Sequence, residues 1–149
     1  MRLSEHFTLI EFTRSQTASR HGIDNTPNEE QLENLKTLAK GLEDVRTKLD
    51  NNPINISSGF RCEDLNDRLG SKRTSRHILG LAADFTCDRY GDVPDVFSVL
   101  ASSSIGFDQL ILEYDSWIHI SFPKEGDEPR RQVLVIDKEG VKAWQKTQD

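Results

Sequence analysis

The sequence predicts an α+β domain in which N-terminal helices precede a small, mostly antiparallel sheet. Leucine and valine recur every three or four residues in the first third of the chain, which is the spacing of one helix face. The later apolar runs are short and bounded by turn residues, which favours strands. Helices followed by a cluster of strands are typical of this class. At 149 residues, without an internal repeat or a linker, we expect a single domain over residues 1–149.

The N-terminal segment predicts short helices over residues 8–21. Thr8 and Glu11 have the spacing of a capping box, in which each residue satisfies a backbone group of the other. Gly22 is a typical stop signal, because glycine readily adopts the left-handed conformation that ends a helix.

The strongest predicted helix spans residues 27–50. Thr26 is the expected N-cap, Pro27 suits the first helical position, and Glu29 completes a capping box. Apolar side chains then recur as one stripe, which we interpret as core packing. The stripe consists of Leu32, Leu35, Leu38, Leu42, Val45 and Leu49.

The rest of the chain predicts short elements separated by turns. Asn51-Asn52-Pro53 breaks the long helix. The expected strands are residues 54–57, 81–86, 107–112, 117–122 and 132–136; the expected helices are residues 63–69 and 94–103, with a terminal helical turn over residues 141–146.

Composition and charge exclude several classes of function. The formal charge is −6 and no element concentrates Lys and Arg, so we expect no nucleic-acid partner. No apolar run is long enough to cross a membrane, and we expect no membrane insertion. The first six residues lack the apolar core of a signal peptide, so we expect synthesis in the cytoplasm without Sec export. We also expect a monomer.

Cys62 and Cys87 are the only cysteines of the chain. Without an export signal they are expected to be reduced and to pack as small hydrophobic side chains. Their positions beside Arg61 and Asp84 leave open a disulfide after release into an oxidising space. Neither has the paired spacing of a thiolate zinc site.

The chemistry of the chain is concentrated around two of its four histidines, His77 and His119. A turn at Gly80 leads from His77 into a predicted strand that presents Asp84, and His119 lies on a second predicted strand. Two imidazoles and a carboxylate, with a fourth position left to water, are the usual ligands of a catalytic zinc ion. The pattern therefore predicts one Zn²⁺ held by His77, Asp84 and His119.

Three segments of the chain resemble the motifs of one peptidase family. They are Ser75-x-His77-x-x-Gly80-x-Ala82-x-Asp84, Ser57-Ser58-Gly59-Phe60-Arg61 and Trp117-x-His119, with Asn66 and Gly70 at further matching positions. The family comprises zinc peptidases that cut peptidoglycan stem peptides, among them D-alanyl-D-alanine carboxypeptidases, phage L-alanyl-D-glutamate endopeptidases and the fold-related hedgehog domain. The match covers roughly residues 55–122, and Phe60 replaces the family's tyrosine.

The resemblance implies a hedgehog-like peptidase fold and further site residues. Arg61 is expected to stabilise the scissile carbonyl or a substrate carboxylate, which suits its rigid fork of donors. Ser75 and Trp117 are expected to contact the substrate. Each of the three also has a structural reading: an ion pair for Arg61, a turn for Ser75 and core packing for Trp117.

At the position of the catalytic base the chain departs from the family pattern. The family usually has Asp or Glu three residues before its second histidine, where this chain has Ser116. Glu113 and Asp115 are the candidates, and Glu113 matches the spacing of the hedgehog glutamate. A three-residue hairpin loop would make Glu113 a diagonal neighbour of His119, about 7–8 Å away, whereas a two-residue loop would turn it to the other face.

Taken together, these features predict a zinc metallopeptidase that hydrolyses amide bonds of peptidoglycan stem peptides, of carboxypeptidase or endopeptidase type. Small size and the lack of a signal peptide fit a phage lysis enzyme (an endolysin) or a virion-associated enzyme that acts at the bacterial cell wall. The alternatives are a non-catalytic zinc-binding module or virion component of the same fold, favoured by Ser116, and a metal-free globular domain.

Overall fold

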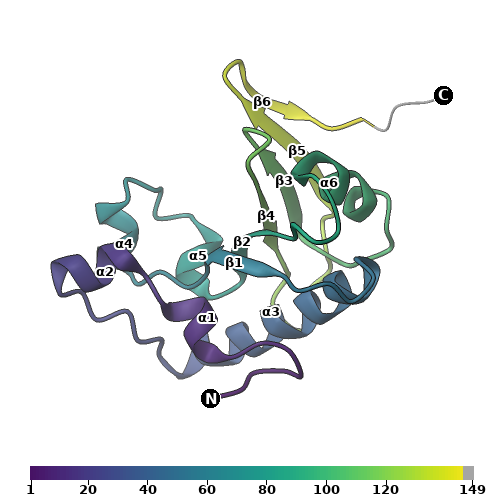
Figure 1. Ribbon diagram of the computed structural model, residues 1–149. Helices are drawn as coiled ribbons and strands as arrows, with labels where there is room; N and C mark the ends of the chain where they lie inside the picture. The colour runs from purple at the N-terminus through teal and green to yellow at the C-terminus, as the bar shows by residue number, and fades with distance from the viewer. Residues whose placement is uncertain (146–149) are drawn as a thin grey trace.

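In a computed structural model of the chain, residues 1–145 are described and form an α+β fold (Figure 1). The helices are α1 (Leu9–Thr13), α2 (Gln16–His21), α3 (Glu29–Lys48), α4 (Glu63–Arg68), α5 (Arg76–Leu79) and α6 (Val93–Ala101). The strands are β1 (Asn55–Ser58), β2 (Ala82–Thr86), β3 (Gln109–Glu113), β4 (Trp117–Ser121), β5 (Gln132–Asp137) and β6 (Gly140–Ala143).

The six strands form one sheet in the order β1-β2-β4-β3-β5-β6. All neighbouring strands are antiparallel except β3 and β5, which are parallel. The predicted fold class is therefore confirmed, including the mostly antiparallel sheet. In Figure 1, α1, α2, α4 and α5 gather at the β1–β2 end of the sheet, and the β5–β6 hairpin extends from the other end.

The two faces of the sheet have different surroundings, because side chains alternate along each strand. Phe85, Ile118 and Leu112 lie opposite one another on one face and belong to the buried core with the apolar stripe of α3 and with α6. Asp84 and His119 lie opposite one another on the second face. Helices α3 and α6 thus cover the apolar face and leave the polar face for a site.

The long helix packs as predicted but begins later. Within the predicted stripe, Leu32 is half-buried and the other five side chains are buried. The prediction of Thr26 as N-cap and Glu29 as its capping-box partner is wrong. Asn28 is the N-cap and forms the capping box with Gln31. Thr26 instead donates from its backbone and its hydroxyl to the Asp24 carboxylate, which holds the chain in a turn ahead of α3.

The predicted helical turn over residues 141–146 is also wrong. Residues 140–143 form strand β6, and Lys146 lies outside the described residues. Gly140 has φ 115°, a conformation that glycine adopts without strain, and it closes a hairpin in which Val141 pairs with Ile136. Pairing with β5 satisfies backbone groups that one isolated helical turn would leave exposed.

Two further predictions concern the cysteines and the membrane. Cys62 and Cys87 are both free; Cys87 is buried and Cys62 is half-buried at the N-cap of α4. None of the helices within residues 1–145 has the length and apolar character needed to span a bilayer.

Candidate metal centre

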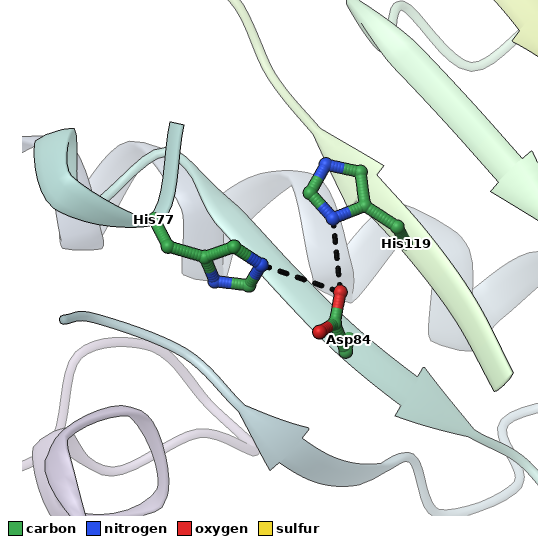
Figure 2. Close-up of side chains that lie close together, drawn as sticks. All are labelled: His77, Asp84 and His119. Carbon is green, nitrogen blue, oxygen red and sulfur yellow. Dashed lines mark hydrogen bonds and ion pairs between the residues drawn. The ribbon is translucent and has the colours of Figure 1, made fainter. Parts of the chain in front are cut away.

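Three side chains from separate elements converge on the polar face of the sheet (Figure 2). Asp84 of β2 lies directly opposite His119 of β4 in the antiparallel ladder. His77 reaches them from α5, which packs against β2. In Figure 2 all three side chains point toward one another, as the sequence pattern predicted.

The distances among the three side chains fit a tetrahedral metal. His77 Nε2 lies 3.3 Å and His119 Nδ1 lies 2.9 Å from the same oxygen, Asp84 Oδ1. One ligand atom from each residue can be chosen so that all lie within 4.8 Å of one another. Zinc bonds of 2.0–2.1 Å in a tetrahedron place ligand atoms about 3.3 Å apart. Two imidazoles and a carboxylate are also the donor types that zinc prefers.

The orientation of His77 leaves its Nε2 available for a cation. Nδ1 lies 2.7 Å from the carbonyl oxygen of Gly59, and because a carbonyl only accepts, Nδ1 is the protonated nitrogen. In the neutral ring the Nε2 lone pair therefore faces the Asp84 carboxylate. A cation between these two acceptors would satisfy both, and a hydrogen bond that fixes the tautomer is typical of metal-ligating histidines.

Asp84 is held in its ionised form. The residue is 9% exposed, and this burial would raise its pKa. The hydrogen bond with His119 and the adjacent imidazole of His77 outweigh the burial and hold the pKa of Asp84 well below its ordinary value. The site therefore contains a carboxylate, and not a carboxylic acid, at neutral pH.

Two glycines allow the segments around His77 to approach one another. A Cβ on Gly59 would lie 2.6 Å from the carbonyl oxygen of Phe12, and one on Gly80 would lie 2.8 Å from that of Gln31. Gly80 also has φ 79° and ends α5. The backbone N–H of Arg61 donates to the carbonyl of His77 at 3.1 Å, so two of the three sequence motifs are hydrogen-bonded to each other.

A buried asparagine holds the loop that precedes His77. The side-chain amide of Asn66 donates to the carbonyls of Ser71 and Lys72 at 3.3 and 3.0 Å, and Asn66 is fully buried. Gly70, at φ 73°, makes the turn from α4 into this loop. These contacts give a structural reason for the two further matching positions in the sequence.

All seven predicted site residues line one cleft of about 600 Å³ on the polar face of the sheet. They are Arg61, Ser75, His77, Asp84, Glu113, Trp117 and His119. The other lining residues are Ser71, Lys72, Thr74, Arg76, Gln109, Ile111, Arg130 and Ile136. A larger hollow of about 1110 Å³ lies beside α1 and α2 and contains none of the seven.

The hairpin between β3 and β4 places Glu113 in this cleft. Glu113 pairs with Trp117 and Ile111 pairs with His119, so the loop has three residues and Glu113 is diagonal to His119 on the same face. The Trp117 indole N–H donates to the Glu113 carboxylate at 2.9 Å. Burial and the nearby charge of Asp84 raise the pKa of Glu113, and the Trp117 hydrogen bond partly opposes this rise.

The other two residues considered for the base position lie in the hairpin turn. Asp115 is exposed with φ 54°, and the exposed Ser116 hydroxyl donates to the carbonyl of Tyr114. Neither lines the cleft. Sequence alone left the length of this loop open. With three residues in the loop, Glu113 lies in the cleft and Asp115 does not.

Arg61 and Ser75 each combine a structural contact with a place in the cleft. The Arg61 guanidinium lies 3.7 Å from Asp84 and donates from Nε to the Ser58 hydroxyl at 3.2 Å. Burial lowers its pKa, an effect that the carboxylates of Asp84 and Glu113 oppose. The Ser75 hydroxyl accepts from the backbone N–H of His77 at 3.2 Å and caps α5.

Several cleft residues were missed by sequence reasoning. Gln109 and Ile111 could have been found, because they precede Glu113 by four and two residues and share its face of the strand. Arg76 adjoins a predicted ligand but gave no signal of its own. Arg130 lies in a loop far along the chain, and only the tertiary fold brings it to the cleft.

A comparison with protein families gives a match over most of the chain. Residues 5–121, well over half of the chain, match the model of a family described as Peptidase M15. None of the curated proteins matches the chain. The matched range includes all three candidate metal ligands, Arg61 and Glu113. This protein is therefore a member of the zinc-dependent M15 family of metallopeptidases.

Proposed function

We propose that this protein is a zinc peptidase that hydrolyses amide bonds of peptidoglycan stem peptides. The observation that carries the proposal is the cleft, in which a metal-binding set, a half-buried carboxylate and a guanidinium meet. The family match supports the peptidase class, and the resemblance of the three motifs supports the stem-peptide substrate.

In this proposal His77, Asp84 and His119 hold the single zinc ion. The chemistry that zinc supplies when bound is that of a Lewis acid, which polarises a carbonyl and makes water a stronger nucleophile at neutral pH. The Gly59 carbonyl and the Ser75 hydroxyl position His77. The β2–β4 ladder positions the other two ligands.

Glu113 is the proposed general base and acid. It takes a proton from the attacking water and later gives it to the leaving amine. Its raised pKa brings the carboxyl closer to the operating pH, which favours proton transfer in both directions. Trp117 holds one carboxylate oxygen by its indole N–H, so the carboxylate is oriented before a substrate arrives.

Arg61 is the proposed stabiliser of developing negative charge. Its guanidinium is positioned by Asp84 and Ser58, and its remaining N–H groups are available to the oxyanion or to a substrate carboxylate. Ser75 and Trp117 line the cleft and are proposed to contact the peptide.

A non-catalytic zinc module of the same fold is the second candidate. It was favoured by Ser116 at the family's acid position. The location of Ser116 in an exposed turn, with Glu113 in the cleft, reduces that support. The proposed enzyme would act at the bacterial cell wall, and a phage lysis or virion-associated role follows from the same resemblance.

The proposal is tested by digesting purified peptidoglycan with zinc-loaded protein and identifying the products by mass spectrometry. Glu113→Gln should lower the rate at least about 100-fold while zinc content stays the same, because general acid–base catalysis contributes about 10²–10⁴-fold. Asp115→Asn, in the same hairpin, is the matched control and should keep the activity. Intact peptidoglycan with zinc-loaded wild type would instead support the binding module.

A further inference from the structure

The cleft carries more positive than negative side chains, although the chain as a whole is acidic. Its charged lining consists of Arg61, Lys72, Arg76 and Arg130 against Asp84 and Glu113, whereas the formal charge of the chain is −6. Arg61 already lies beside Asp84 at the metal-binding set. The other three cations lie outside the catalytic assignment made above.

A buried carboxylate anchors two of these cations. The Asp108 side chain is 4% exposed. Arg130 donates two hydrogen bonds to its carboxylate, from Nε at 3.0 Å and from Nη2 at 2.8 Å. The Arg130 backbone N–H contacts the same carboxylate at 3.3 Å. Arg76 lies on α5, the helix that carries His77, and its Nη2 is 3.4 Å from the Asp108 carboxylate. Bidentate pairing fixes the plane of a guanidinium, so Arg130 is held before any ligand binds.

The anchor leaves donors free for a ligand. A guanidinium has five N–H groups, and the bidentate pair uses two of them. The Arg130 side chain is 53% exposed and lines the cleft. One carboxylate between two guanidiniums leaves one positive charge unbalanced. Lys72, on the same cleft, makes no ion pair within residues 1–145 and adds a second.

Arg130 comes from a part of the chain beyond the family match, which ends at residue 121. Its neighbours are bonded to the two residues that precede β3: Gln132 N–H donates to the carbonyl of Asp108 at 3.0 Å, and Arg131 N–H donates to that of Phe107 at 3.2 Å. The parallel pairing of β3 with β5 continues this attachment and brings Ile136 into the cleft. The C-terminal segment thus completes the cleft.

We propose that Arg130 and Arg76, anchored by Asp108, form a subsite for a substrate carboxylate that is separate from the scissile amide. The inference rests on the proposed function, because it places the anion in the same cleft as the reacting bond. It defines the substrate class as a peptide with a free carboxylate away from the reaction centre. Arg61, which contacts Asp84, would remain available to the oxyanion.

The test uses a synthetic stem peptide and two versions of it. One version has the D-glutamyl α-carboxylate replaced by a carboxamide, and the other has the C-terminal carboxylate replaced in the same way. Dissociation constants and kcat/KM are measured with zinc-loaded wild type, Arg130→Gln, Arg76→Gln and Arg73→Gln. Arg73 is the matched control, because it pairs with Asp67 and Glu63 on the surface and does not line the cleft.

Wild type should bind one of the two amides about 10- to 100-fold more weakly than the acid, as expected for a charge-assisted hydrogen bond. Arg130→Gln should reduce this discrimination toward unity, and Arg73→Gln should keep it. Arg76→Gln should reduce it in part, and this variant leaves the Asp108–Arg130 pair intact if Arg130→Gln proves unstable. A variant that only reduces the fraction of folded protein weakens the apparent binding of the acid and of the amide by the same factor, so the ratio of their dissociation constants stays the same.

The outcomes separate this inference from the proposed function. Cleavage of all three peptides at equal rates would overturn the subsite and keep the peptidase. Selective binding of the acid that depends on Arg130, without cleavage, would keep the subsite and overturn the peptidase. Equal discrimination in wild type and Arg130→Gln, or binding of none of the peptides, would overturn the subsite.

Discussion

His77 is oriented by a backbone carbonyl, and that carbonyl belongs to a glycine that no other residue could replace without movement. Gly59 approaches the backbone of α1 so closely that its added Cβ would overlap Phe12. The same residue accepts the hydrogen bond that fixes the His77 tautomer. Gly59 therefore contributes both to the packing of α1 and to the orientation of His77, a candidate metal ligand.

Gly59→Ala should lower the free energy of unfolding by about 1–3 kcal/mol, the usual cost of forcing extra atoms into a packed region. Because the shift displaces the carbonyl that orients His77, zinc affinity should fall as well. Gly91→Ala is the matched control: its Cβ would lie 3.8 Å from Asp95, an ordinary contact. Urea denaturation and zinc titration check both effects, and equal stability of the two variants would contradict the account.

Trp117→Phe tests whether the Trp117 hydrogen bond lowers the pKa of Glu113. The indole hydrogen bond stabilises the charged carboxylate and lowers the pKa of Glu113, so its loss should raise that pKa further. A base acts in its deprotonated form, and activity rises as pH increases through its pKa. The acid limb of the kcat/KM profile should therefore move to higher pH in Trp117→Phe. An unchanged limb would show that Trp117 does not tune Glu113.

The elements that sequence reasoning located best are those with a local signal. The stripe of α3 and the Thr8–Glu11 capping box are confirmed, because helix periodicity and capping depend on neighbouring residues. The start of α3 was misplaced, since Thr26 and Asn28 are both good caps; Thr26 is bonded to Asp24, and Asn28 forms the capping box with Gln31. The C-terminal strand β6 was missed, because its partner β5 supplies the reason for its conformation.

Asn28→Ala should lower the free energy of unfolding by about 1 kcal/mol, because it removes the side chain that caps α3. Thr26→Ala should cost less, since the Thr26 hydroxyl contacts only the exposed carboxylate of Asp24. Chemical denaturation of the two variants measures the difference. A larger decrease in the free energy of unfolding for Thr26→Ala than for Asn28→Ala would indicate that Thr26 is the N-cap of α3.

Across the whole molecule, one sheet serves two purposes. Its apolar face packs on α3 and α6, and its polar face carries the three candidate metal ligands and Glu113. Sequence patterns were sufficient to find side chains on the polar face, because they lie in short motifs. They were insufficient for Arg130, whose place in the cleft depends on the parallel β3–β5 pairing. The sequence therefore predicts the part of the cleft around His77, Asp84 and His119, and does not predict the part that Arg130 forms.

Asp108, which holds Arg130 at the cleft, also contributes to the stability of the fold. Hydrogen bonds from Arg130 hold the pKa of Asp108 below its ordinary value, although burial opposes them. A carboxyl whose folded pKa is lowered contributes stability above its unfolded pKa, about 3.9, and loses that contribution as pH falls through the folded pKa. Asp108→Asn should therefore cost about 1.5–3 kcal/mol at pH 7.

The difference between wild type and Asp108→Asn should shrink as pH falls below about 4. Urea denaturation at a series of pH values measures it. Asp115→Asn, in an exposed turn, is the control and should change the free energy of unfolding by less than about 0.5 kcal/mol. A difference that stays constant down to pH 2 would show that the Asp108 charge contributes nothing.

Zinc content per chain shows whether His77, Asp84 and His119 hold one zinc ion. Native mass spectrometry of zinc-loaded wild type should give one ion per chain. His119→Ala and Asp84→Ala should lose it, and His21→Ala, an exposed histidine on α2, should keep it. Chelator should lower the Tm of wild type, because an ion bound only by the folded state stabilises it. A zinc-free wild type, or one zinc retained by His119→Ala and Asp84→Ala, would contradict the account.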